Sequence, residues 1–308
     1  MSTFFLKIAI LDTFWIILTG SLVAICTSLL GCFLILRKMA MVGDAISHAV
    51  LPGIVLAYLI AQSRASVYML LGAAIFGVLI TVLIELLHKR GFLQMDAAIG
   101  LSFTSLFAFG VILLSAYAGQ VDLDQDCVLY GEIAYVPLDT WQWQGNDLGP
   151  VAVWHLSGLF LLILGFLFWG YKGLVITTFD EAYALALGIQ AAFWHYALMG
   201  LVSLTTVFSF ESVGAILVVA FLVGPPAAAF LLTRHLQKML LLSTFLGVLS
   251  AVGGYFLAEA LNGSIAGGMA TAVGLVFLLC FGLSQWQNRR LVHSEEGGES
   301  ELSPSSLG

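Results

Sequence analysis

Long apolar runs separated by short polar connections make up most of the sequence. Each run is close to the roughly 20 residues that an α-helix needs to cross the hydrocarbon core of a bilayer. A helix satisfies its backbone polar groups within the segment, as a lipid environment requires. We therefore predict an all-α, polytopic membrane protein with about nine transmembrane helices, over Phe14–Leu36, Gly43–Ala61, Val67–Leu87, Ala97–Tyr117, Val151–Tyr171, Ala192–Phe210, Val213–Leu232, Met239–Ala258 and Ile265–Trp286.

The composition supports this fold class. Hydrophobic residues form 60% of the 308 residues and charged residues only 9%, whereas a soluble domain carries about 25% charged residues. No cleavable signal pattern accompanies the first apolar run, so we expect that run to be retained as a span. The net charge of −7 argues against binding of nucleic acid.

The basic residues fall mainly in alternate connections. If the N-terminus lies outside, the inner side receives nine of the eleven Lys and Arg residues and the outer side keeps Lys7 and Arg64. This bias agrees with the positive-inside rule, so we expect the N-terminus outside and the C-terminus inside. The inner residues are then Arg37, Lys38, Lys89, Arg90, Lys172, Arg234, Lys238, Arg289 and Arg290.

Two segments outside the runs are acidic. We expect a membrane domain over residues 1–288 and a polar, disordered inner tail over residues 289–308, because the tail is rich in serine and acidic residues. The outer segment Ala118–Pro150 holds six Asp and Glu residues and no Lys or Arg. A negative outer mouth would raise the local concentration of cations, although a merely solvated loop explains the same composition.

The stretch Gly43–Gly53 places polar groups at the head of an apolar run. Asp44 and His48 are four residues apart, so on a helix their side chains point the same way. Pro52 has no N–H and frees the carbonyl of His48. Because an intramembrane carboxylate is costly, these groups indicate a site for a divalent metal or a proton. The alternative is a polar pair that water and lipid head groups solvate at the membrane interface.

Two further prolines lie within the seventh apolar run. Pro225 and Pro226 leave the carbonyls of Phe221 and Leu222 without helical donors, so we expect this helix to be broken or kinked. Broken membrane helices occur where they line a cavity or pack on protein, and we expect both prolines to line a pathway. Glu211 is expected to mark the turn that separates this helix from the one before it.

The longest inner connection runs from Lys172 to Gln190. Asp180 and Glu181 are placed to open a short helix and Gly188 to close it. A short capped helix on the inner face could contact a partner or could simply connect two spans. His195, near the end of the next span, has the position of an interfacial residue.

The stretch Arg37–Gly53, R-K-M-A-M-V-G-D-A-I-S-H-A-V-L-P-G, resembles the signature of permease subunits of bacterial ABC importers for manganese, zinc and iron. The double-proline span and the F-D-E-A…A-L-G-I connection occupy matching places. The resemblance implies a type II ABC importer-like permease, in which Asp44 and His48 fall on metal-contacting positions. It places Asp180, Glu181, Ala182 and Gly188 on the helix that couples the permease to its ATPase.

The resemblance also implies partners and a substrate. It implies two cytoplasmic ATPase subunits, an extracytoplasmic metal-binding protein, and a second copy or a homologous permease, in the lipid of the bacterial plasma membrane. The chain has no nucleotide-binding motif of its own, so hydrolysis is expected on the partner, and no bound cofactor is expected. The form G-D-A-I-S-H-A-V-L-P-G resembles the manganese and iron branch of the family more than the zinc branch. Manganese is the expected cargo, with zinc or ferrous iron as alternatives. A proton-coupled secondary metal transporter is the alternative from another class.

Overall fold

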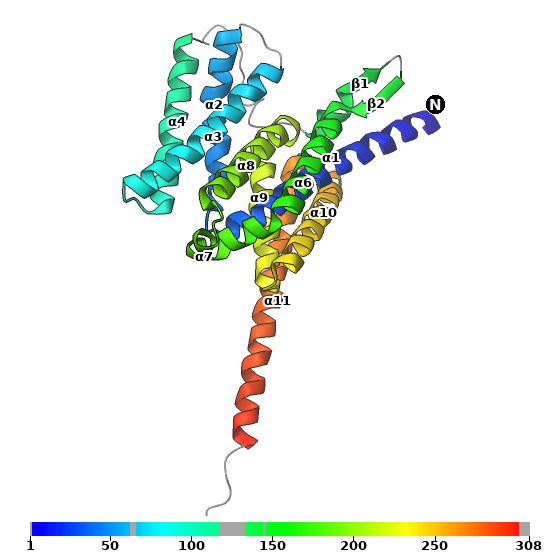
Figure 1. The fold of residues 1–308 in the computed structure, drawn as a ribbon. Coiled ribbons are helices and arrows are strands. Elements are labelled where there is room, and N and C mark those ends of the chain that lie inside the picture. The colour runs from blue at the N-terminus through cyan, green and yellow to red at the C-terminus, as the bar shows by residue number, and fades with distance from the viewer. Residues whose placement is uncertain (1, 62–65, 118–132, 144–145, 302–308) are drawn as a thin grey trace, which may run out of the picture.

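The computed structural model describes residues 2–61, 66–117, 133–143 and 146–301. Within these ranges nine helices are long and apolar enough to cross a membrane, and they coincide with the nine predicted runs (Figure 1). The helical fold class is thereby confirmed. The nine helices are α1 (Ser2–Leu36), α2 (Val42–Ala61), α3 (Ser66–Arg90), α4 (Met95–Tyr117), α6 (Val151–Phe179), α8 (Ala191–Val213), α9 (Ala215–Leu232), α10 (Leu236–Leu261) and α11 (Ile265–Glu301).

The membrane helices form two groups that meet at α8. Helices α2, α3 and α4 pack on one another and lie together at one side of the bundle (Figure 1). Helices α1, α9, α10 and α11 pack together as a second group, with α6 against α1. Helix α8 contacts α2 and α3 of the first group and α1 and α9 of the second. It therefore joins the two groups, together with a direct contact of α2 with α9.

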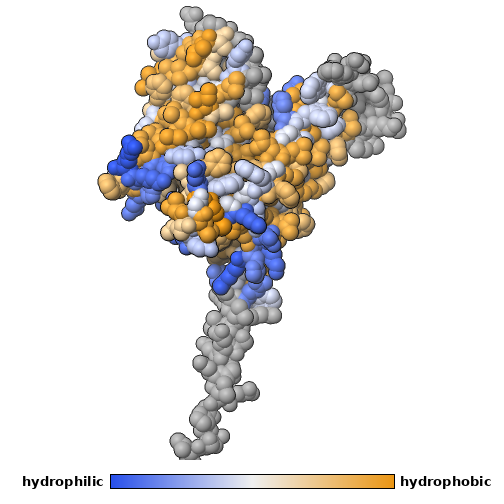
Figure 2. Space-filling view, viewed as in Figure 1, coloured by the Kyte–Doolittle hydropathy of each residue, from blue (hydrophilic) through white to orange (hydrophobic). Residues whose placement is uncertain are grey.

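The two ends of the bundle differ in what they carry. The N-terminus and an antiparallel hairpin of β1 (Thr140–Trp143) and β2 (Asn146–Pro150) lie at one end (Figure 1). The short helix α7 (Glu181–Ala186) and the distal part of α11 lie at the other. Figure 2 shows apolar side chains over most of the visible face, with hydrophilic ones gathered toward the α7 end. This is the distribution of a body that lipid surrounds.

The outer acidic segment is described only in part. A 3₁₀ helix, η1 (Ile133–Leu138), precedes the β1–β2 hairpin, and the sequence did not predict either element. The structure describes the side chain of only one of the six acidic residues, Asp139. Four of the others, in 118–132, lie outside the described residues altogether. The prediction of a negative outer mouth therefore stays a prediction.

Three helix boundaries differ from the expected ones. Helix α8 continues through Glu211 and ends at Gly214, whose φ of +81° a helix does not allow, so Gly214 rather than Glu211 separates α8 from α9. Helix α6 runs on to Phe179, eight residues beyond the predicted end. Helix α11 continues past Arg289 to Glu301, where a disordered tail was expected, and its sequence from Ile265 to Glu301 contains no proline to stop it.

The double proline does not break α9. The helix is continuous from Ala215 to Leu232, and both Pro225 and Pro226 are buried in it. The Ser28 hydroxyl of α1 donates a hydrogen bond of 3.5 Å to the Phe221 carbonyl that Pro225 frees. The prediction of a broken helix is therefore wrong in this structure, because a neighbouring helix supplies a donor for one of the two freed carbonyls. The alternative of a kink stays a prediction.

Candidate functional site

Asp44 and His48 lie on one face of α2, in its first two turns. The distance between His48 Nε2 and Asp44 Oδ1 is 3.7 Å. The side chains are 34% exposed for His48 and 46% for Asp44, so both remain accessible to an ion. Asp44 is in the first turn of α2, where the helix dipole favours a negative charge. The predicted i, i+4 pair therefore exists as a pair in space.

Two aromatic side chains of α4 hold the His48 ring. The centroid of the imidazole lies 5.3 Å from that of Phe103 and 5.6 Å from that of Phe107. Among the described residues, no group forms a hydrogen bond with the buried Nδ1 of His48. The phenyl rings restrict the imidazole and leave Nε2 directed toward Asp44. The sequence did not reveal this contact, because phenylalanines are common in apolar runs.

The geometry suits one shared cation. An ion with bonds of about 2.1 Å to nitrogen and oxygen spans two atoms 3.7 Å apart at an angle of about 120°. Neither side chain would have to move far to bind it. Within the described part of the chain no three His, Cys, Asp or Glu side chains form a metal-binding group. A metal at this pair would therefore complete its coordination with water, a carbonyl or a second protein chain.

Pro52 lies one turn beyond His48, within α2. It is buried, and α4 approaches it so closely that a Cβ on Gly110 would lie 2.8 Å from Pro52 Cδ. The Ser47 hydroxyl donates to the Asp44 carbonyl in the same segment, at 2.5 Å. The close approach of Gly110 gives Pro52 a packing role between α2 and α4. A role in lining a pathway stays a prediction for Pro52, and equally for Pro225 and Pro226.

The predicted connector helix is present as α7. The Asp180 carboxylate accepts a hydrogen bond of 2.9 Å from the backbone N–H of Tyr183, which makes Asp180 the N-cap, and Glu181 is the first helical residue. Gly188 has a φ of +75°. The N–H of Gly188 bonds to the Leu185 carbonyl and that of Ile189 to the Ala184 carbonyl, as in a Schellman motif.

Helix α7 exposes apolar side chains toward its surroundings. Ala184 is buried beneath the helix, whereas Ala182 lies on its exposed side. Four large apolar residues around it are more than half exposed, although they lie outside the membrane-crossing helices or at their ends. A short helix of this kind offers a small apolar surface to a partner protein. These residues are Phe179, Tyr183, Leu185 and Leu187.

An accessible pair of ligands within a membrane bundle, with a capped helix protruding at one end, is the arrangement of a membrane transport subunit. The family model described as the ABC 3 transport family matches residues 11–284, so the chain belongs to that family. It is a multi-pass protein of the bacterial inner membrane. Membership in this family contradicts the alternative of a proton-coupled secondary transporter.

Several relatives share almost the whole chain. The manganese transport system membrane protein MntD of Bacillus subtilis (strain 168) is 53% identical over 87% of this chain and 90% of its own length. The zinc transport system membrane protein TroD of Treponema pallidum (strain Nichols) is 43% identical over 87% of this chain and 73% of its own length. The solved structure of PsaBC from Streptococcus pneumoniae in complex with Fab has a TM-score of 0.70 and 32% identity, over 87% of this chain and 90% of that one.

Proposed function

We propose that the chain is the membrane permease of an ATP-driven importer and that it moves a divalent metal, manganese, into the cytoplasm through a site at Asp44 and His48. The observation that carries this proposal is the 3.7 Å separation of Nε2 and Oδ1 on an accessible face of α2. A carboxylate and an imidazole are ligands that Mn²⁺ accepts. The relative MntD is named for manganese transport.

Zinc is the second candidate cargo, since the relative TroD is named for zinc transport. Thiolates would favour zinc, but Cys26, Cys32 and Cys280 are buried, and none of them belongs to a metal-binding group among the described residues. Ferrous iron accepts the same nitrogen and oxygen ligands as manganese. Weak, incomplete coordination by two side chains also suits a site that must release its ion during transport.

The proposal includes partners. Helix α7 with its exposed apolar residues is the surface on which a cytoplasmic ATPase subunit docks, and the opposite end of the bundle receives an extracytoplasmic metal-binding protein. A second permease, either a copy of this chain or a homologue, packs beside it. The accessible faces of Asp44 and His48 leave room for that second chain to add ligands. The N-terminus then lies outside and α7 inside, as the distribution of basic residues indicates.

The test is uptake of Mn²⁺ into proteoliposomes that contain the permease, the ATPase and the binding protein. Asp44→Asn keeps the shape but removes the charge, and His48→Ala removes the imidazole, so each should abolish uptake while the complex still assembles. The matched control is Asp96→Asn, an exposed carboxylate in the first turn of α4, which should transport normally. Near-normal uptake by both site variants would refute the site, and competition by Zn²⁺ or Fe²⁺ identifies the preferred cargo.

A further inference from the structure

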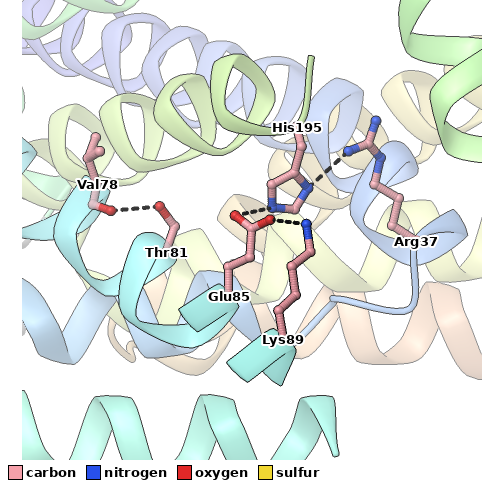
Figure 3. Close-up of polar contacts among 6 residues, drawn as sticks. All are labelled: Arg37, Val78, Thr81, Glu85, Lys89 and His195. Carbon is pink, nitrogen blue, oxygen red and sulfur yellow. Dashed lines mark hydrogen bonds and ion pairs between the residues drawn. The ribbon is translucent and has the colours of Figure 1, made fainter. Parts of the chain in front are cut away.

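A polar cluster links the end of α1 with α3, α6 and α8, and Figure 3 shows its members Arg37, Glu85, Lys89 and His195. Its centre is Arg37, the residue that follows α1. The guanidinium donates from Nε to Thr178 Oγ1 and from Nη2 to Thr177 Oγ1, both at 3.1 Å, and from Nη1 to His195 Nδ1 at 3.2 Å. The two threonines end α6 and His195 begins α8. Arg37 therefore clamps together the two helices that flank α7.

His195 extends the cluster to α3. Since a guanidinium can only donate, Nδ1 of His195 accepts its hydrogen bond and the ring hydrogen lies on Nε2. Nε2 faces Oε2 of Glu85 at 3.8 Å, as an ion-pair contact and not a hydrogen bond (Figure 3). The Tyr196 hydroxyl of α8 also lies against this carboxylate. The imidazole of His195 therefore lies between the guanidinium of Arg37 and the carboxylate of Glu85.

The charge at the start of α7 also acts on Arg37. Burial lowers the pKa of the Arg37 guanidinium, and the negative charge of Glu181, the first residue of α7, opposes that shift. A displacement of α7 would therefore change the field at Arg37. Three hydrogen bonds hold the Arg37 side chain to α6 and α8 and restrict its rotamer. A force on Arg37 would therefore act on these two helices.

Helix α3 packs closely on both α8 and α2. On the α8 side, Gly77 lies directly against the Ser203 side chain, which would have to shift to admit a Cβ. Gly53 of α2 and Gly72 of α3 approach each other's backbone carbonyls closely enough that neither could carry a Cβ. Close-packed helix pairs of this kind move together. Helix α2 carries Asp44 and His48, so the chain of contacts leads from α7 to the proposed metal site.

We propose that Arg37, His195 and Glu85 form a joint through which movement of α7 displaces α3 and, with it, the α2 face that holds the metal. This inference rests on the proposed function for its cargo. Arg37 and Glu85 are then positioning residues of the transport cycle, because they act through α3 and α2 and do not touch the ion. The cluster is not a second cation site, since the Lys89 ammonium already pairs with the Glu85 carboxylate and the Arg37 guanidinium lies on the other side of His195.

The experiment compares three variants of the full permease, reconstituted with the ATPase and the metal-binding protein. Arg37→Lys keeps the positive charge but a single ammonium cannot bind three acceptors in a fork. Glu85→Gln removes the carboxylate, whose side chain is only 12% exposed. The control is Lys89→Gln, because Lys89 is 59% exposed and its ion pair with Glu85 lies within α3, so its loss disconnects no helices.

Two quantities are measured in the same vesicles: metal imported per ATP hydrolysed, and stimulation of hydrolysis by the metal-loaded binding protein. Because the joint transmits movement between α7 and α2, in Arg37→Lys and Glu85→Gln both quantities should fall at least about fivefold while unstimulated hydrolysis persists. The double variant should be little worse than the worse single one, since the residues act as a unit. Lys89→Gln should match the wild type.

Wild-type values of both quantities in Arg37→Lys and Glu85→Gln would overturn the joint, and so would an equal loss in Lys89→Gln. Failure of both cluster variants to assemble with the ATPase would also overturn it, since the cluster would then only hold the fold. The proposed function fails separately. If the wild type imports zinc and not manganese, the proposed cargo is refuted, and near-normal uptake by both Asp44→Asn and His48→Ala refutes the site. In either case the ratio measured with the imported ion still tests the joint.

Discussion

Replacing Gly188 by valine tests whether α7 must be capped in order to engage its partner. The φ of Gly188 is +75°, and no atom lies within 4 Å of the position that a Cβ would take. The cost is therefore conformational, roughly 1–2 kcal/mol for a residue with a Cβ in the left-handed region. Valine at this position would favour a backbone that breaks the Gly188 N–H to Leu185 bond and the Ile189 N–H to Ala184 bond.

If only the capped form of α7 binds the ATPase subunit, that cost appears as weaker binding. A loss of 1–2 kcal/mol corresponds to an affinity roughly 5- to 30-fold lower. The assay is titration of the detergent-solubilised permease with the ATPase subunit. Gly188→Asn should bind better than Gly188→Val, because asparagine tolerates the left-handed region.

The matched control is Gly158→Val, in α6. A Cβ on Gly158 would likewise have no atom within 4 Å, but the φ of Gly158 is not positive. This variant should bind the ATPase with wild-type affinity. Equal affinity of Gly188→Val and Gly158→Val would refute the argument, because it would show that binding does not depend on the left-handed cap.

Two further predictions concern stability, measured by reversible unfolding in mixed micelles. Gly31→Ala should destabilise the protein by about 1–3 kcal/mol, because a Cβ would overlap the Leu222 carbonyl and approach Pro226 Cγ to 2.9 Å; an unchanged stability would mean that α1 and α9 can separate at no cost. Lys38→Gly should stabilise the protein by about 1 kcal/mol, since Lys38, two residues after the end of α1, has a φ of +58°. Lys38→Ala keeps the strained backbone and should not stabilise the protein. If both variants are more stable than the wild type, the loss of the lysine charge and not the relief of strain is the cause.

The sequence predicted the features that depend on neighbours along the chain. The spans follow from hydropathy, the Asp44–His48 pair from a separation of four residues, and the ends of α7 from Asp180 and Gly188. Each is determined by a local rule: hydrocarbon thickness, helical period or capping chemistry. The same rules misplaced the boundary before α9, because a charged residue, Glu211, was given more weight than Gly214.

The sequence could not predict contacts between distant segments. His195 has the position of an interfacial residue, yet it bonds to Arg37, 158 residues earlier in the chain. Phe103 and Phe107 could not be distinguished from the other phenylalanines of the apolar runs as the pair that holds His48. The double proline removes two backbone donors, but only the packing of α1 shows that Ser28 replaces one of them.

The bond from Ser28 to the Phe221 carbonyl also limits how the bundle can move. Sliding α1 along α9 by one helical turn would leave that carbonyl without a donor in an apolar interior, at a cost of several kcal/mol. Gly31 would at the same time move away from the Leu222 carbonyl, and a residue with a Cβ would have to take its place. The pairing of α1 with α9 is therefore restricted to one register along the helix axes.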